Sequence, residues 1–220
     1  KLFFDKIILL FESNKIFKGD KKLWDENDFF LITYADSIKK QKTKNFRVLG
    51  EFLKKYCNEF NFIHILPFFP FTSDDGFAVK DYKRIDKRHG EWTDFKKIAD
   101  NFRVMSDLVI NHCSSENKLF KNFLKDNSPG KDFFITFDNK PKNLSKITRP
   151  RSSELLKKIK VNEDQKYVWC TFSHDQIDFN FKNPEVLIYF LKVIKFYLDK
   201  NIKAIRLDAV AFLWKELGTK

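Results

Sequence analysis

The sequence predicts an α/β fold in which parallel strands alternate with crossover helices. Short apolar runs follow one another along the chain, separated by segments whose apolar residues recur at helical spacing. The run at residues 62–66 has no in/out alternation, as expected of a strand that is buried on both faces. Close to four strand–helix units can be recognised. Their periodicity does not choose between part of a closed barrel and an open doubly wound sheet.

The first two units follow from local patterns. The first strand is predicted at residues 29–34, and apolar residues at helical spacing predict a helix at 45–56. The second strand, at residues 62–66, is closed by Pro67. A second helix fits residues 93–102.

The third strand is predicted at residues 103–110, and the fourth at residues 202–207. The helix between them is expected to start at Asn183, a good capping residue, with Pro184 at its first position and Glu185 complementing its dipole. Its predicted apolar face consists of Leu187, Phe190, Leu191, Ile194 and Leu198.

Residues 113–178 break the pattern, because they are rich in Asn, Ser, Pro and Lys and show few regular periods. They are too long for an ordinary connection, so we expect a functional loop or a small inserted domain. The predicted organisation is therefore a first part at residues 1–112, an insertion at 113–178, and a continuation at 179–220 with the fourth strand and the start of another helix.

The chain carries a net charge of +12, from 42 Lys and Arg against 30 Asp and Glu. The lysines occur singly or in pairs, which favours a lysine-rich surface over a nucleic-acid partner, although a positive field would also attract a phosphate-bearing substrate. No segment approaches the roughly 20 apolar residues of a membrane span. The odd set Cys57, Cys113 and Cys170 lacks metal-like spacing, which favours free thiols and a cytoplasmic location.

Polar residues at the strand ends are the first candidates for chemistry. Asp107 lies in an apolar strand and needs a buried partner, which could be Arg206. His112, just beyond that strand, could donate to a substrate hydroxyl or serve as a structural hydrogen bonder. Period two puts Arg206 and Asp208 on the same side of the fourth strand. The guanidinium would lower the pKa of Asp208, as a nucleophile needs, and the alternative is a structural ion pair.

Two loops add further candidates. Asp74 and Asp75 lie beside a glycine after the second strand, where they could bind sugar hydroxyls or form a solvated turn. Arg149 and Arg151 flank a proline in the insertion. They could form a rigid site for a phosphate or a carboxylate, or belong to a basic surface loop.

These residues, in this order, resemble the alpha-amylase superfamily (glycoside hydrolase family 13), and within it the sucrose phosphorylase group, which includes glucosylglycerate phosphorylases. The resemblance implies the N-terminal half of a (β/α)8 TIM barrel with a small B domain inserted after the third strand. The stretches that carry it are residues 63–70 (IHILPFFP), 73–77 (SDDGF), 107–112 (DLVINH), 167–172 (YVWCTF), 175–178 (DQID) and 205–218 (IRLDAVAFLWKELG).

By this resemblance Asp208 is the nucleophile and Arg206 orients it. The implied substrate-binding residues are Asp74, Phe77, Asp107, His112 and Phe212. Arg149 and Arg151 would help to select phosphate or the acceptor.

The implied activity is phosphorolysis of an α-glucoside to α-glucose 1-phosphate by double displacement, with inorganic phosphate as co-substrate and no cofactor or metal. The alternatives are a hydrolase or transglucosidase with the same residues, and a non-catalytic amylase-like barrel that serves as an interaction subunit.

The family also needs an acid/base glutamate and a His-Asp pair, which the resemblance implies beyond residue 220. Glu216 looks helical and lies in the wrong place for the acid. We therefore expect the 220-residue chain, which begins at Lys1, to be an incomplete, inactive and poorly soluble fragment.

Overall fold

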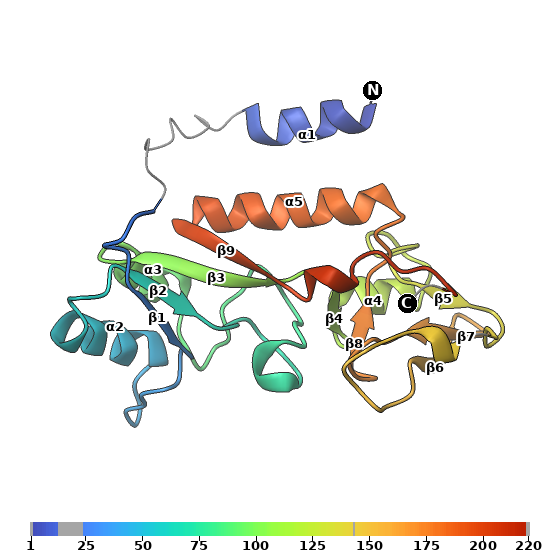
Figure 1. The fold of residues 1–220 in the computed structure, drawn as a ribbon, viewed down its shortest axis with the longest axis horizontal. Coiled ribbons are helices and arrows are strands. Elements are labelled where there is room, and N and C mark those ends of the chain that lie inside the picture. The colour runs from blue at the N-terminus through green and yellow to red at the C-terminus, as the bar shows by residue number, and fades with distance from the viewer. Residues whose placement is uncertain (1, 13–23, 143, 219–220) are drawn as a thin grey trace. The chain divides into compact units, whose positions relative to one another are not determined.

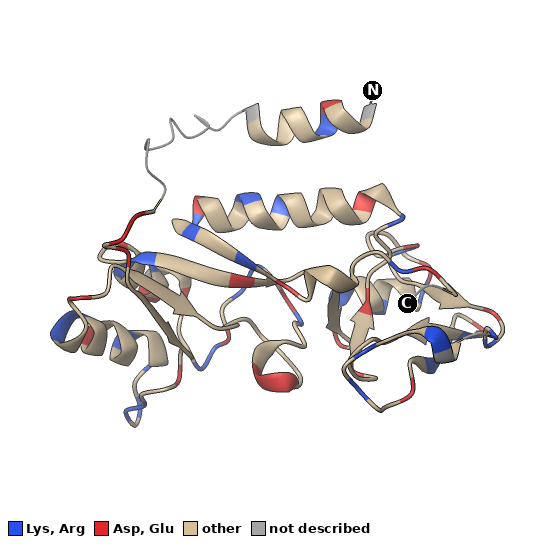
Figure 2. Ribbon diagram, in the orientation of Figure 1, with Lys and Arg blue, Asp and Glu red and all other residues tan. Residues whose placement is uncertain are grey.

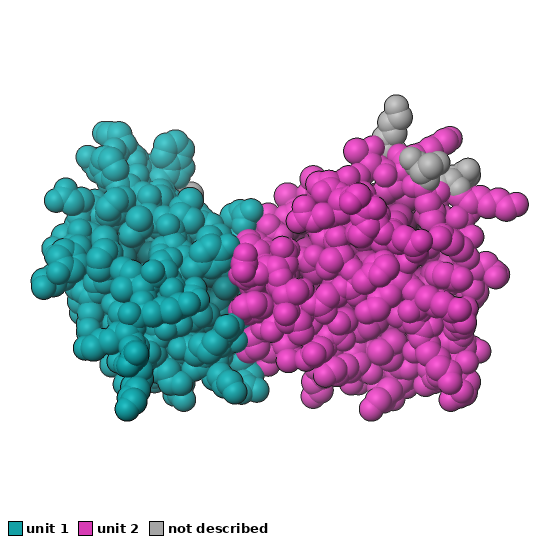
Figure 3. Space-filling model, turned by 90° about the horizontal axis from the view of Figure 1, so that it is seen from below, with its two compact units in different colours: residues 1–69, 83–108, 188–206 teal, residues 70–82, 109–187, 207–220 magenta. Residues whose placement is uncertain are grey.

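The structure is a computed structural model that describes residues 2–12, 24–142 and 144–218. The chain divides into two compact units, shown in different colours in Figure 3. The first comprises residues 1–69, 83–108 and 188–206, and the second comprises residues 70–82, 109–187 and 207–220. Because the chain passes several times from one unit to the other, each unit combines segments that are far apart in the sequence.

A four-stranded sheet forms the centre of the first unit (Figure 1). Its strands, in order, are β1 (Phe30–Thr33), β2 (Phe62–Ile65), β3 (Arg103–Val109) and β9 (Ile202–Asp208). β1 pairs with β2 in parallel, and so does β2 with β3, as predicted. All of β2 is buried, which confirms the prediction of a strand covered on both faces. On β1, an outer strand of this sheet, Ile32 is 61% exposed.

Two helices follow the first two strands and pack against each other. α2 (Asn45–Tyr56) spans the predicted residues, and α3 (Trp92–Ala99) begins and ends slightly before its predicted bounds. The rings of Phe46 and Phe95 meet edge to face, with centroids 5.8 Å apart. A Cβ atom at Gly50 would lie only 3.3 Å from Ile98 Cγ1, so the absence of a side chain permits this close approach.

The long helix α5 (Pro184–Asp199) confirms the predicted cap, because the Glu185 amide donates to Asn183 Oδ1 at 3.0 Å. Its predicted apolar face is wrong in part, since Leu187 is exposed. The helix is apolar on most sides, so its periodicity did not identify the stripe that faces the core. The fully buried stripe consists of Val186, Phe190, Val193 and Tyr197.

The second unit contains the segment that looked irregular in sequence. β4 (His112–Ser114) pairs antiparallel with β8 (Gln176–Asp178), and α4 (Lys118–Phe123) follows β4. A separate antiparallel sheet has the order β5 (Thr136–Phe137), β7 (Asp164–Trp169), β6 (Leu156–Val161). These strands are short, and side-chain alternation over a few residues gives little signal. The predicted boundaries of the insertion, at residues 113 and 178, remain a prediction.

Short 3-10 turns complete this unit: η1 (Asp74–Gly76), η2 (Leu144–Lys146) and η3 (Val210–Phe212). The prediction of a helix after Asp208 is wrong for the residues described up to 218, where only η3 forms. Ala209, which precedes that turn, has the left-handed conformation with φ of 51°. Glu216 is not helical.

One further helix, α1 (Leu2–Glu12), covers the apolar run near the start of the chain, for which no helix was predicted. None of the described helices is both long and apolar enough to cross a membrane. Lys and Arg residues are spread over the helices and loops of both units, as the sequence predicted (Figure 2).

Candidate active site

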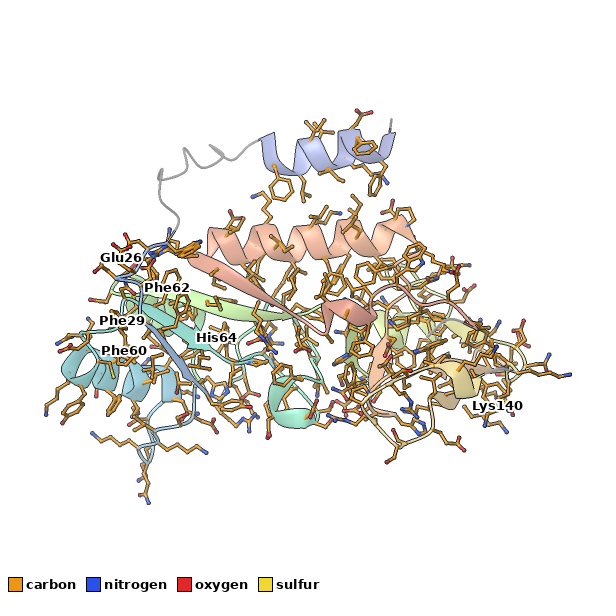
Figure 4. The ribbon with its side chains drawn as sticks, in the orientation of Figure 1. Glu26, Phe29, Phe60, Phe62, His64 and Lys140 are labelled. Atoms are coloured by element: carbon orange, nitrogen blue, oxygen red, sulfur yellow. The ribbon has the colours of Figure 1, made fainter. Side chains whose placement is uncertain are left out.

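Asp107 is the centre of a charged cluster on the sheet of the first unit. It is fully buried on β3, where its Oδ1 accepts from Arg206 Nη1 on the neighbouring strand β9. His64 on β2, labelled in Figure 4, lies on its other side with Nε2 2.7 Å from Oδ2. The predicted pairing of Asp107 with Arg206 is therefore confirmed. His64 was missed, because a histidine in an apolar strand looks like an ordinary core residue.

Asp208 ends β9, as predicted. Arg206 precedes it by two positions, so strand alternation directs both side chains to the same side of β9. Asp208 is partly exposed, and the Arg206 side chain is 46% exposed. A carboxylate that water and a ligand can reach, at the carboxyl end of a barrel strand, is suited to attack a substrate.

In the second unit, three of the predicted residues lie together. His112 Nε2 is 3.1 Å from the Phe77 carbonyl oxygen and 3.0 Å from Gln176 Nε2. The same Gln176 amide nitrogen donates to Asp74 Oδ2 at 2.8 Å. Gln176, which sequence reasoning missed, thus links Asp74 with His112. Burial lowers the pKa of His112, so its ring is neutral at pH 7.

Aromatic contacts join two further predicted residues to this group. The Phe172 ring lies 5.1 Å from the His112 ring and 5.4 Å from the Phe212 ring, measured between centroids. The Arg151 guanidinium stands over Phe172, 5.8 Å from the ring centroid. Phe172 therefore contacts His112, Phe212 and Arg151. The family resemblance includes residues 167–172, but it implied no role for Phe172 itself.

Arg149 is held at the base of the same loop. Its Nη1 donates to the Thr171 carbonyl oxygen at 3.2 Å and to Ser153 Oγ at 3.4 Å. Together with Phe212 and Trp214, Arg149 lines a small cavity of about 140 Å³. The loop therefore presents one anchored arginine and, in Arg151, one exposed arginine.

The loop that carries Asp74 is fixed by Asp175. That carboxylate accepts from Thr72, from Ser73 Oγ at 2.5 Å and from Ser115 Oγ at 2.6 Å. Burial raises the pKa of Asp175, but these hydrogen bonds lower it by more, so the group stays ionised. Asp74 and its neighbour both adopt positive φ, 57° and 49°, a conformation that aspartate tolerates better than most residues.

A second charged cluster is connected to His112 through Asn111. Asp178 is fully buried and accepts from the Thr171 amide at 3.0 Å and its hydroxyl at 2.5 Å. Lys215 Nζ is 3.0 Å from Asp178 Oδ2 and donates to Asn111 Oδ1 at 2.8 Å, with its side chain only 5% exposed. Burial lowers the pKa of Lys215, against the attraction of Asp178. Sequence reasoning did not single out Lys215, because a lysine is read as a surface residue by default.

The described residues contain no group of three His, Cys, Asp or Glu side chains that could hold a metal ion. Cys57, Cys113 and Cys170 are all free and buried. Burial raises the pKa of Cys113 and of Cys170, which makes both thiols poor nucleophiles.

The comparisons with known proteins agree with these motifs. The model of the alpha-amylase catalytic domain matches residues 51–219. Glucosylglycerate phosphorylase from Spirochaeta thermophila is 43% identical over 89% of this chain and 33% of its own length, and that from Escherichia coli is 40% identical over 97% of this chain and 39% of its own.

The crystal structure of sucrose 6F-phosphate phosphorylase from Thermoanaerobacter thermosaccharolyticum matches with a TM-score of 0.81 and 33% identity, over 91% of this chain and 43% of that one. The chain thus spans only 33% and 39% of the lengths of these two phosphorylases. The family match covers most of the chain, and the parallel sheet agrees with part of a TIM barrel. The chain belongs to the alpha-amylase family.

Proposed function

We propose that the protein containing this chain transfers a glucosyl group from an α-glucoside to phosphate with retention, and that glucosylglycerate is its α-glucoside. The observation that carries the reaction is Asp208 at the carboxyl end of β9, two residues beyond an arginine that is held by buried Asp107. The substrate choice is supported by identities of 40% and 43% to glucosylglycerate phosphorylases, against 33% to the sucrose 6F-phosphate enzyme.

In this proposal Asp208 attacks the anomeric carbon and forms a β-linked glucosyl ester as the bond to the leaving group breaks. Phosphate then attacks the same carbon, which releases the Asp208 carboxylate and gives α-glucose 1-phosphate. Asp107 keeps Arg206 in place, two residues before the proposed nucleophile. No cofactor takes part.

A retaining mechanism needs a second carboxyl group about 5–5.5 Å from the first, as general acid and base. Glu216 follows Asp208 in the chain, but its Oε1 pairs with Lys182 Nζ at 3.4 Å. We therefore propose that the acid lies in another part of the protein, and that the 220 residues alone do not turn over substrate.

The cluster around His112 is proposed to hold the glucosyl ring. Asp74 offers carboxylate oxygens to sugar hydroxyls, and Phe77 and Phe212 offer apolar surface to the ring faces. Their shared contacts with Gln176 and Phe172 support a common site. His112 is 1% exposed, so it acts at the wall of that site and reaches one hydroxyl at most.

Arg149 and Arg151 are proposed to attract phosphate or the glycerate carboxylate. Arg151 lies over the ring that contacts His112, which brings a cation beside the proposed sugar site. Phosphate competes with a large excess of water as acceptor, and a fixed positive charge there raises its local concentration. The free cysteines support a reducing location, and we propose the cytoplasm.

The test uses the purified gene product that contains this chain. It is incubated with α-glucose 1-phosphate and glycerate, fructose or glycerol, and phosphate release is measured. We expect release that depends on glycerate and disappears in Asp208→Asn. An absence of release with every acceptor, together with slow hydrolysis of α-glucosides, would instead identify a hydrolase, and inactivity on both would favour the non-catalytic barrel.

The arginine loop is tested in the direction of phosphorolysis. Arg151→Met should raise KM for phosphate about tenfold, because it removes one charge-assisted contact worth about 1.4 kcal/mol. The matched control is Arg88→Met, which removes an exposed arginine of the first unit that pairs with Asp86. Equal KM values in the two variants would remove Arg151 from the phosphate site.

A further inference from the structure

The two ring nitrogens of His112 face different surroundings, and the neutral ring carries one proton for both. At Nε2, two contacts favour opposite protonation states of the nitrogen. The Phe77 carbonyl oxygen at 3.1 Å requires a proton on Nε2, whereas the Gln176 amide nitrogen at 3.0 Å requires a lone pair there. Gln176 cannot turn its oxygen to this side, because the same nitrogen donates to the Asp74 carboxylate at 2.8 Å. The Nε2 side therefore does not decide the tautomer.

At Nδ1, the contact favours one protonation state of the nitrogen. The contact there is the side-chain nitrogen of Asn111, at 3.2 Å. An amide nitrogen can only donate, so Nδ1 must accept as long as Asn111 keeps this orientation. The tautomer of His112 then depends on what holds the Asn111 amide.

Two buried charges hold that amide. Asn111 Oδ1 accepts from Lys215 Nζ at 2.8 Å, and Asn111 Nδ2 donates to Asp178 Oδ2 at 3.1 Å. An ammonium group has only donors and a carboxylate only acceptors, so a flipped amide would meet a like partner on both sides. The Lys215–Asp178 pair is almost fully shielded from water. Each of the two unfavourable contacts of a flipped Asn111 amide would therefore carry a high free-energy cost.

We propose that Lys215 is a positioning residue which, through the Asn111 amide, keeps the proton of His112 on Nε2. The Nε2–H group points to the side on which Asp74 and Phe77 lie. In the structure this group donates to the Phe77 carbonyl oxygen at 3.1 Å. A sugar hydroxyl would share this donor in the proposed function, on which the role of this tautomer in turnover rests. Lys215 follows Asp208 in the same segment, so this segment supplies the proposed nucleophile and also sets the donor.

The test is a direct reading of the tautomer by long-range ¹⁵N–¹H NMR on protein labelled in its histidine rings. The His112 signals are assigned by their loss in His112→Gln. In the wild type we expect a pyrrole-like Nε2 and a pyridine-like Nδ1. The reverse pattern would overturn the proposal without any variant.

Lys215→Met removes the donor to Asn111 Oδ1, and we expect a second His112 tautomer with the proton on Nδ1. Lys215→Arg keeps a donor and should keep the single tautomer. Lys182→Met, which removes a half-exposed lysine paired with Glu216, is the matched control and should leave the His112 signals unchanged.

Asn111→Leu is the second variant, for the case in which Lys215→Met does not fold. It leaves the Lys215–Asp178 pair in place but removes the amide, so it should also populate the Nδ1–H tautomer. A single Nε2–H tautomer in the variants that fold would overturn the role of Lys215. These spectra need no turnover, so they are separate from the phosphate-release assay, whose failure would reject the proposed function alone.

Discussion

Among the residues that the structure describes, each unit buries one carboxylate completely, and the two carboxylates are paired with different cations. In the first unit Asp107 is paired with Arg206, whose side chain is 46% exposed, and with His64. In the second unit Asp178 is paired with Lys215, whose side chain is 5% exposed. Both pairs join residues that are far apart in the sequence.

The difference in exposure separates two roles. A half-exposed guanidinium keeps donors on its outer edge that can serve a substrate or a neighbouring carboxylate while one edge is anchored. The buried Lys215 ammonium directs donors to Asp178 and Asn111 and is shielded from water, so its effect is to orient these protein groups. This difference supports the proposals that the Asp107 cluster serves the reacting centre and that the Asp178 cluster positions His112.

The largest effect on stability is expected from Lys215→Met, because it leaves Asp178 as a buried charge without its cation. The free energy of unfolding should fall by about 3–5 kcal/mol, measured by urea denaturation. The control Lys182→Met removes an exposed partner of Glu216 and should change it by less than about 1 kcal/mol. Equal losses in the two variants would contradict the contrast between a buried and an exposed pair.

A smaller loss of stability is expected from Asp107→Asn, about 1–3 kcal/mol. The amide keeps the shape of the carboxylate, and the Arg206 guanidinium is exposed enough to be solvated by water. Activity, in contrast, should fall more than in any variant of the Asp178 cluster, because Arg206 loses its anchor. Urea denaturation and the phosphate-release assay on the same protein would check both. A stability loss as large as that of Lys215→Met would show that the two clusters do not differ.

The smallest effect concerns pH. Burial lowers the pKa of His112 below its usual 6.5, so as the pH falls below 6.5 the unfolded chain takes up a proton before the folded chain does. Stability therefore decreases with falling pH in this window. His112→Gln should make that decrease shallower in urea midpoints measured between pH 6.5 and about pH 5. His89, whose pKa is also lowered by burial, remains in both proteins as an internal reference. Parallel pH profiles would contradict this account of His112.

Most of the first unit could be predicted from the sequence, because its elements are long enough to show a period. The α2 bounds rest on local rules and were confirmed, as was the Asn183 cap of α5, although Asn183 itself belongs to the second unit. The buried stripe of α5 was not predicted, since an apolar residue such as Leu187 looks the same on either side of a helix that is apolar nearly all round. To identify the buried stripe of α5, one must know which elements pack against the helix.

The second unit was harder to predict, because its strands are short and their pairing is set by tertiary contacts. The β6–β7 hairpin did leave a signal that went unused. Asn162 takes φ of 50° in the two-residue connection between β6 and β7, and asparagine is favoured at such positions. Within the site, the Asp107–Arg206 pair was predictable because an aspartate in an apolar strand needs a cation. Lys215 was not, since nothing local marks a lysine as buried.

Trapping the covalent intermediate directly tests whether Asp208 is the nucleophile, as proposed. The gene product that contains this chain is mixed with an activated α-glucosyl donor, quenched in acid, digested and analysed by mass spectrometry. We expect one added hexosyl unit on the peptide that contains Asp208, and none in Asp208→Asn. A hexosyl unit on a different carboxylate, or turnover with no labelled peptide at all, would contradict it.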